Sequence, residues 1–174
     1  MADKSLHRLP LTAHWKVGLC DDVAVVAEKE GNQLLQFSVS RGEETWRREL
    51  PQGMTRNCTK VINRKTQEIL LQERRGDEVT IVLDEHGAEI NRVNKRGLLR
   101  ASLPQHLVYQ VDDDGGWHLE LHDENNEIKT LRSPGQPWSN YSLLSVCGMT
   151  GKVVLGDPDN KTLSIFTESK TQRT

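Results

Sequence analysis

The stretch "GKVVLGDPDNKTLSIF", residues 151–166, places the turn-forming string D-P-D-N between two apolar runs. Asp, Pro and Asn between two apolar segments are typical of a tight turn that joins two antiparallel strands, so the stretch predicts a β-hairpin. The pattern recurs without gaps 46, 84 and 129 residues earlier, in "QHLVYQVDDDGGWHLE", "QEILLQERRGDEVTIV" and "DVAVVAEKEGNQLLQF". The hairpin is therefore one copy of a repeated unit.

The four copies agree at their apolar positions on both sides of the turn. The first equivalent set is Ala24, Ile69, Leu107 and Val153, and a set after the turn is Leu34, Val79, Trp117 and Leu163. A short apolar segment precedes each hairpin and another follows the first three, so each unit contains four short strands at spacings of 45, 38 and 46 residues. A period of this length with four strands is typical of a propeller blade.

We therefore predict an all-β chain, a β-propeller of four four-stranded blades that forms a single domain over residues 1–174. The blades are expected at approximately residues 14–50, 58–93, 98–133 and 141–170. The last unit lacks a fourth strand, and we expect strand 4–11, "KSLHRLPL", to complete that blade and remove an exposed sheet edge. The alternative is a dimer in which two chains exchange end strands and form an eight-bladed ring.

Composition narrows the classes of partner and location. The net charge is −2, and no run approaches the roughly 18 apolar residues of a membrane span, so we expect no membrane partner. The three cysteines, Cys20, Cys58 and Cys147, are not at metal-like spacing and favour a reducing compartment. The N-terminal sequence lacks the apolar core of a secretory signal, so we expect a cytoplasmic protein without a cofactor.

The last repeat resembles the NHL repeat, in which a glycine precedes an apolar strand that ends in Asp, and an Asn precedes a strand that ends in Phe. The residues that carry the resemblance are Gly151, Asp157, Asn160, Ile165 and Phe166. The other three copies match the apolar positions and depart from the pattern at the Asp and Asn. Propellers of this family are often the C-terminal domains of TRIM-type proteins. The resemblance thus implies recognition of protein or RNA targets, with ubiquitin ligase activity in upstream domains.

The string "HLELH" is the main candidate for metal binding. Alternation along a strand would project His118, Glu120 and His122 to one face, and imidazole and carboxylate are common zinc ligands. Positions i and i+2 of a strand are roughly 6–7 Å apart, however, which is wide for a compact site. The alternative interpretation is a polar strand face near the outer edge of the blade.

No motif indicates a catalytic nucleophile or a bound phosphate. The chain has no G-x-S-x-G elbow and no phosphate-binding glycine loop, and no histidine neighbours a cysteine in the sequence. The carboxylates of "GDPDN" are expected to form a simple turn rather than a calcium site. We therefore predict that the protein is not an enzyme.

Charge is distributed unevenly along the chain. Residues 41–65 contain seven basic and three acidic residues, whereas residues 112–127 contain seven acidic residues and no Lys or Arg. In a propeller, the turns between the second and third strands lie at the same end as the connections between blades. This geometry predicts a binding face made of Arg56, Arg74, Arg75, Lys95, Arg96, Trp138 and Tyr141.

These observations leave three functions open. The first is a non-enzymatic scaffold that binds a protein partner through this loop face, as arginine and aromatic residues are enriched at protein hot spots. The second is RNA binding through the same residues, against which Asp112, Asp113 and Asp114 would act by repelling a polyanion. The third is a sugar-binding or metal-dependent module. A homodimer is compatible with the opposite charges of the second and third units.

Overall fold

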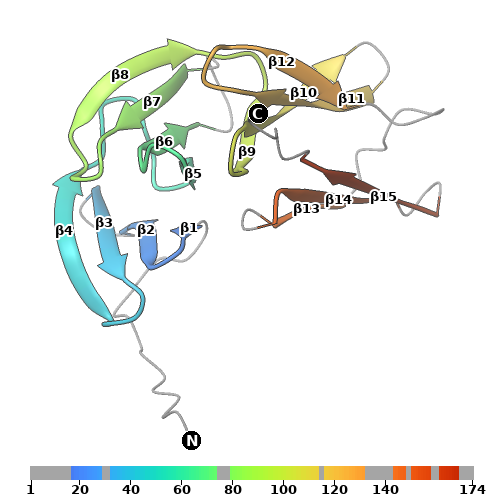
Figure 1. Ribbon diagram of the computed structural model, residues 1–174. Helices are drawn as coiled ribbons and strands as arrows, with labels where there is room; N and C mark the ends of the chain where they lie inside the picture. Colours follow the sequence, from blue (N-terminus) through green and yellow to red (C-terminus); the bar gives the residue numbers. More distant parts are fainter. Residues whose placement is uncertain are drawn as a thin grey trace, which may run out of the picture. The chain divides into compact units, whose positions relative to one another are not determined.

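The computed structural model describes residues 17–28, 32–73, 79–113, 116–131, 143–147, 150–157 and 161–168. These residues form fifteen strands and no helix (Figure 1). Within them there is accordingly no helix long and apolar enough to cross a membrane.

The strands form four antiparallel sheets in which the spatial order follows the order in the chain. Blade one contains β1 (Gly18–Cys20), β2 (Val23–Ala27), β3 (Gln33–Ser38) and β4 (Glu43–Glu49). Blade two contains β5 (Thr59–Ile62), β6 (Ile69–Gln72), β7 (Val79–Leu83) and β8 (Glu89–Asn94). Blade three contains β9 (Leu98–Ser102), β10 (Leu107–Asp113), β11 (Gly116–His122) and β12 (Ile128–Leu131). Blade four contains β13 (Leu143–Cys147), β14 (Lys152–Asp157) and β15 (Thr162–Thr167).

A series of consecutive four-stranded antiparallel sheets is the topology of a β-propeller, which confirms the predicted fold class. Blade four has three strands among the described residues. The strand expected at residues 4–11 lies outside the described residues, so its pairing with blade four stays a prediction.

The chain divides into two compact units. Unit 1 contains blades one and two, and unit 2 contains blades three and four together with the loop Asn63–Thr66. The prediction of a single domain over residues 1–174 stays a prediction.

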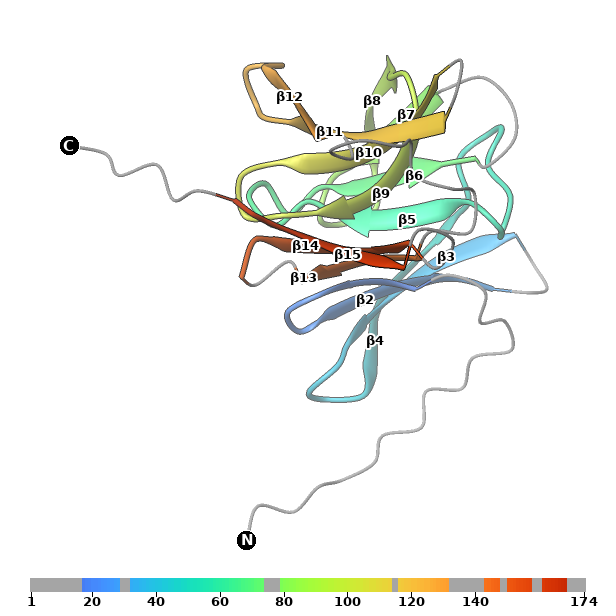
Figure 2. The same cartoon turned by 90° about the vertical axis from the view of Figure 1, so that its right-hand side faces the viewer.

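The two strands of the hairpin predicted at residues 151–166 pair with each other. Strands β14 and β15 run side by side in both views, with Val153 opposite Phe166 and Asp157 opposite Thr162 (Figures 1 and 2). The other three copies form the equivalent pairs β2–β3, β6–β7 and β10–β11. The repeated apolar pattern therefore marks the two central strands of every blade.

Both faces of a central strand are covered in blade two. Ile69, Leu70 and Leu71 of β6 are all buried, as the continuous apolar run predicts. Burial of a side chain of this size contributes about 1.5–3 kcal/mol, so these strands dominate the stability of the blade. The outer strand β8 is mostly exposed and polar.

Each unit has its own hydrophobic core. In unit 1, side chains from blades one and two form one cluster, which includes Leu34, Ile69 and Ile81. In unit 2, side chains from blades three and four form another, which includes Leu119 and Val153. The side chains of neighbouring blades thus pack together within each unit.

In unit 1, the outer strand of blade one also holds the turn between β7 and β8. The indole Nε1 of Trp46 donates to the carbonyl of Glu85 at 2.9 Å, and Nε of Arg48 donates to the carbonyl of His86 at 3.3 Å. Gly87 lies under the indole with φ +80°, and a Cβ there would lie 2.8 Å from Cη2 of Trp46. Only glycine fits this position without displacing the tryptophan.

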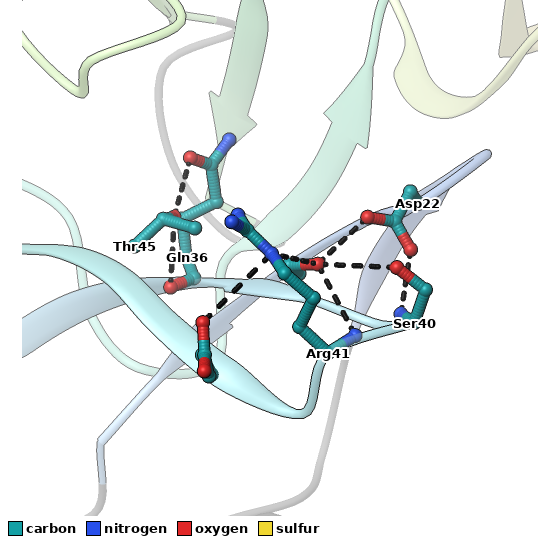
Figure 3. A network of polar contacts seen from close by, with 7 residues as sticks. Asp22, Gln36, Ser40, Arg41 and Thr45 are labelled. Carbon is teal, nitrogen blue, oxygen red and sulfur yellow. Dashed lines mark hydrogen bonds and ion pairs between the residues drawn. The ribbon is translucent and has the colours of Figure 1, made fainter.

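A polar network fixes the turn between β3 and β4 (Figure 3). The carboxylate of Asp22 accepts hydrogen bonds from the Ser38 hydroxyl at 2.7 Å and from the backbone N–H of Ser40 at 2.6 Å. These bonds lower the pKa of Asp22, with the Ser38 hydroxyl as the largest cause. Nε of Arg41 completes the network by donating to the Ser38 hydroxyl at 3.2 Å.

Candidate functional site

The antiparallel order gives every blade two distinct ends. We call the end that carries the turn between the second and third strands the 2–3 end, and the end that carries the other two turns the opposite end. The predicted binding face lies at the 2–3 end, so its described residues are located first.

In unit 1, the connection between blades one and two is fastened to the 2–3 end of blade two. The backbone N–H of Thr55 donates to the carboxylate of Glu73, the residue that follows β6. Nζ of Lys60 donates to the carbonyls of Arg56 at 3.1 Å and Cys58 at 3.0 Å. The exposed Arg56 follows Thr55 in this connection, and its part in a binding face stays a prediction.

Lys60 is an internal anchor of this connection. The residue is 4% exposed, and burial lowers the pKa of its ammonium group. A buried lysine of this kind needs hydrogen-bond acceptors, which the two carbonyls supply. The alternating pattern of "CTKVIN" gives no sign that this lysine is buried, so the sequence missed its role.

In unit 2, the connection that enters blade three lies against the 2–3 end of that blade. Nη2 of Arg96 donates to the carbonyl of Asp112 at 3.3 Å, and Arg96 is exposed. Gly97 has φ +94°, and a Cβ there would lie 2.6 Å from the carbonyl oxygen of Gln110. The close approach of the two backbones explains why glycine follows Arg96.

The rest of the predicted face is described only in part. Lys95 is half-buried at the end of unit 1. Four predicted residues lie outside the described residues, namely Arg74, Arg75, Trp138 and Tyr141. The convergence of all seven residues into one face therefore stays a prediction.

The three residues of the "HLELH" string form a hydrogen-bonded chain instead of an open polar face. Oε1 of Glu120 lies 3.2 Å from Nε2 of His118, and Oε2 lies 2.8 Å from Nε2 of His122. The histidines are 4% and 6% exposed, so this polar strand face, on the strand next to the outer strand β12, is buried. The ring of Tyr109 lies against that of His122, with 4.7 Å between the centroids, and helps to bury it.

The arrangement of this string does not favour a metal. Among the described residues, no group of three or more His, Cys, Asp or Glu side chains has a geometry that could hold a metal ion. Burial raises the pKa of Glu120, but hydrogen bonds from His122 and His118 outweigh it and leave the pKa below its ordinary value. An ionised Glu120 that accepts from two imidazole N–H groups needs no cation.

Unit 2 also has a pocket at the opposite end of blade three. Its volume is about 90 Å³, and it lies between the loop Asn63–Thr66, the β9–β10 turn and the β11–β12 turn. The lining residues are Asn63, Lys65, Thr66, Gln105, His106, Leu107, His122, Asp123 and Glu124.

Ion pairs organise the wall of this pocket. Nζ of Lys65 lies 2.5 Å from Oε2 of Glu124, and Nδ1 of His106 contacts Oε1 of Glu168. Glu168 follows β15 and is almost completely buried, so it fastens the β9–β10 turn to blade four within unit 2. Asp123 accepts from two backbone N–H groups of its own turn, at Asn125 and Glu127.

The sequence did not predict this pocket. Its residues come from the second and third repeats, and no spacing in the sequence indicates that they meet. The one available signal is the string "HDENNE", residues 122–127, in which Asp begins a turn and acidic residues gather beside a histidine.

Comparisons with known proteins give structural matches only. No protein-family model matches the chain, and no curated protein matches its sequence. BamB from Moraxella catarrhalis is 15% identical, with TM-score 0.46, over 91% of this chain and 51% of that chain. Hydrazine synthase from Kuenenia stuttgartiensis is 10% identical, with TM-score 0.47, over 90% of this chain and 55% of that one.

Glutaminyl cyclase from Myxococcus xanthus is 14% identical, with TM-score 0.45, over 83% of this chain and 65% of that one. The chain thus spans about half to two thirds of the length of these solved structures. The assignment to the propeller class rests on the strand order and register of the four sheets.

Proposed function

We propose that this protein is a non-enzymatic recognition propeller that binds a protein partner through the 2–3 end of its blades. The observation that carries the proposal is that basic and acidic residues both occur at that end. In unit 1, Glu73 accepts from the backbone N–H of Thr55, the residue before the exposed Arg56, and in unit 2, the exposed Arg96 donates to the backbone carbonyl of the exposed Asp112. A surface of mixed charge suits a protein of complementary pattern better than a uniform polyanion.

Binding of single-stranded RNA is the second candidate. Arg56 and Arg96 could contact phosphates, and Trp138 and Tyr141 are the residues proposed to stack on bases. The carboxylate of the exposed Asp112 would oppose a polyanion at the same end of unit 2. RNA binding through this face would weaken steeply as salt is added.

The resemblance of residues 151–166 to an NHL repeat supports a narrower version of the proposal. In this version the chain is the target-recognition part of a TRIM-type ubiquitin ligase and acts in the cytoplasm. Gly151, the glycine of that pattern, has φ +63° and is packed against Glu168, so its place in the repeat has a physical reason. Sugar binding remains the third candidate, and none of the described residues supports it specifically.

A charge-reversal experiment tests the proposal. The double variant Arg56→Glu with Arg96→Glu is compared with Lys129→Glu with Lys152→Glu, which changes the net charge equally at exposed strand positions. Partners are identified by proximity labelling in cells with each form. We expect a set of proteins that is lost with the first double variant and kept with the second.

The RNA alternative is separated by anisotropy of a fluorescent mixed-sequence single-stranded RNA at low and physiological salt. Micromolar binding at physiological salt that the first double variant abolishes would put RNA in place of a protein partner. Equal labelling by both double variants would contradict the proposed face.

A further inference from the structure

Strand β15 has one paired edge and, among the described residues, one open edge. It pairs with β14 at the end of its sheet, whereas the third strands of the other blades, β3, β7 and β11, each lie between two strands. Its Leu163 and Ile165 are 67% and 60% exposed. An open edge that carries apolar side chains favours aggregation unless another segment covers it. The question is which segment fits this edge.

The hydrogen bonds at the end of β15 identify the backbone groups that face its open edge. The N–H of Glu168 donates to the carbonyl of Gly151 at 2.7 Å, on the side of β14. Successive residues of a strand point their N–H and C=O groups to opposite sides, so every second residue before Glu168 also faces β14. The backbone groups of the residues between them, Leu163, Ile165 and Thr167, therefore face the open edge.

Blade one shows the same arrangement with its fourth strand in place. Its hairpin has the register of blade four, 129 residues earlier. The carbonyl of Asn32 accepts from the N–H of Leu50 at 2.9 Å, so the even-numbered residues after Asn32 face β4. Among them, Gln36 lies opposite Trp46, which packs against the core cluster of unit 1. Ile165 is the equivalent of Gln36, so an apolar residue is expected opposite Ile165.

The N-terminal string "HRLPL", residues 7–11, has the pattern that this edge requires. Directly opposite residues of an antiparallel pair project their side chains to the same face, so two alternating leucines match Ile165 and Leu163. Proline lacks an N–H and is tolerated in a strand where its backbone faces away from the partner. With Leu9 opposite Ile165 and Leu11 opposite Leu163, the intervening Pro10 faces outward.

We propose that residues 7–11 bind the open edge of β15 in the same chain as an antiparallel fourth strand, with Leu9 opposite Ile165 and Leu11 opposite Leu163. The N–H groups of the two leucines then complete the ladder with β15. Pro10 presents no N–H at the outer edge of the completed blade, and an edge without that donor is a poor template for a further strand. The segment thus both covers the apolar edge and protects the blade from pairing with other chains.

Amide hydrogen exchange of the full chain tests this pairing residue by residue. The amides of Leu163, Ile165 and Thr167 should exchange slowly in the intact chain and at least about tenfold faster after removal of residues 1–11. The amides of Ser164 and Phe166 face β14 and should keep their protection. This alternation is specific to a paired edge, because a general loss of stability would affect both sets of amides.

Two proline substitutions test the register without removing the segment. His7→Pro removes an N–H that the register directs at Thr167, so the amide of Thr167 should lose its protection. Arg8→Pro removes an N–H that faces outward, as Pro10 does, and should leave the exchange of β15 unchanged. Both variants gain one proline, so the side of the strand is the difference between them. Equal exchange in the two variants would overturn the proposed register.

Light scattering on the same samples identifies the chain that supplies the segment. A mass of one chain, with protected amides at all protein concentrations, is the expected result. Protection that rises with concentration, together with a mass of two chains, would overturn the pairing within one chain and assign the edge to a second copy. Fast exchange of Leu163 and Ile165 in the intact chain would overturn the proposal altogether. Arg56 and Arg96 are unchanged in every variant, so these outcomes are independent of the proposed protein-binding face.

Discussion

Nε2 of His122 lies 2.8 Å from Oε2 of Glu120, two residues away on β11, and Nε2 of His118 reaches the other oxygen of the same carboxylate. The folded state therefore favours the ionised form of Glu120. Its pKa lies below the ordinary value of 4.5, although burial acts to raise it.

This relationship predicts a stability that depends on pH. A carboxyl with a lowered pKa in the folded state stabilises the fold above its unfolded pKa, and the contribution is lost as pH falls through the folded value. Glu120→Gln should lower the free energy of unfolding by about 1–3 kcal/mol at pH 7. Urea unfolding should show this difference shrinking below pH 4.5. The exposed Glu127→Gln is the control, and a difference independent of pH would contradict the assignment.

The glycine of the NHL-like repeat gives a second prediction. Gly151 has φ +63°, and a Cβ there would lie 3.0 Å from Cβ of Glu168, so Gly151→Ala should destabilise the protein by about 1–3 kcal/mol. Gly156, on β14, has nothing within 4 Å of a Cβ, and Gly156→Ala should be neutral or slightly stabilising. Thermal unfolding of the two variants measures the contrast, and equal midpoints would refute it.

The packing of Trp46 on Gly87 can be separated from backbone strain. Gly87 and Gly53 have similar φ angles, +80° and +89°, but only Gly87 would place a Cβ against Trp46. Both alanine variants should lose stability through φ, and Gly87→Ala should lose about 1–3 kcal/mol more through the clash. Denaturant unfolding measures both, and an equal loss would show that the indole moves aside without cost.

Lys60 is predicted to hold Arg56 at the 2–3 end of blade two. Lys60→Met removes the donor to the carbonyls of Arg56 and Cys58 while it keeps the length of the side chain. Faster amide hydrogen exchange is expected in residues 54–58, with a loss of about 1–3 kcal/mol in the free energy of unfolding. The exposed Lys152→Met should change neither quantity. Unchanged exchange in Lys60→Met would mean that Glu73 alone fixes the loop.

Closure of blade four gives the last prediction. Among the described residues, strand β15 pairs with β14 alone. Its Leu163 and Ile165 are 67% and 60% exposed. If residues 4–11 add the fourth strand, removal of residues 1–11 should lower the unfolding midpoint and promote aggregation through the open edge. Light scattering on the intact chain would distinguish a monomer from the strand-exchanged dimer. An unchanged midpoint after removal would exclude both forms of closure.

The sequence by itself determined the repeated hairpin and, from it, the all-β blades. This was possible because strand alternation and turn chemistry are local: Asp157 and Asn160 mark a turn whatever lies beyond it. The continuous run of Ile69, Leu70 and Leu71 likewise indicated burial on both faces, because only a central strand tolerates apolar residues on each side. The same topology predicts the arginines of the binding face at the 2–3 end, and that face stays a prediction.

Only the tertiary structure decided which polar residues are buried and which residues of different repeats meet. Lys60, His118 and His122 look like solvated positions in an alternating strand, yet packing within each unit removes them from water and imposes acceptors on them. The pocket joins Lys65 of the second repeat to His106 and Glu124 of the third, and Glu168 of the fourth repeat contacts His106. Such contacts depend on how one sheet packs on the next, and no residue spacing within a repeat encodes that distance.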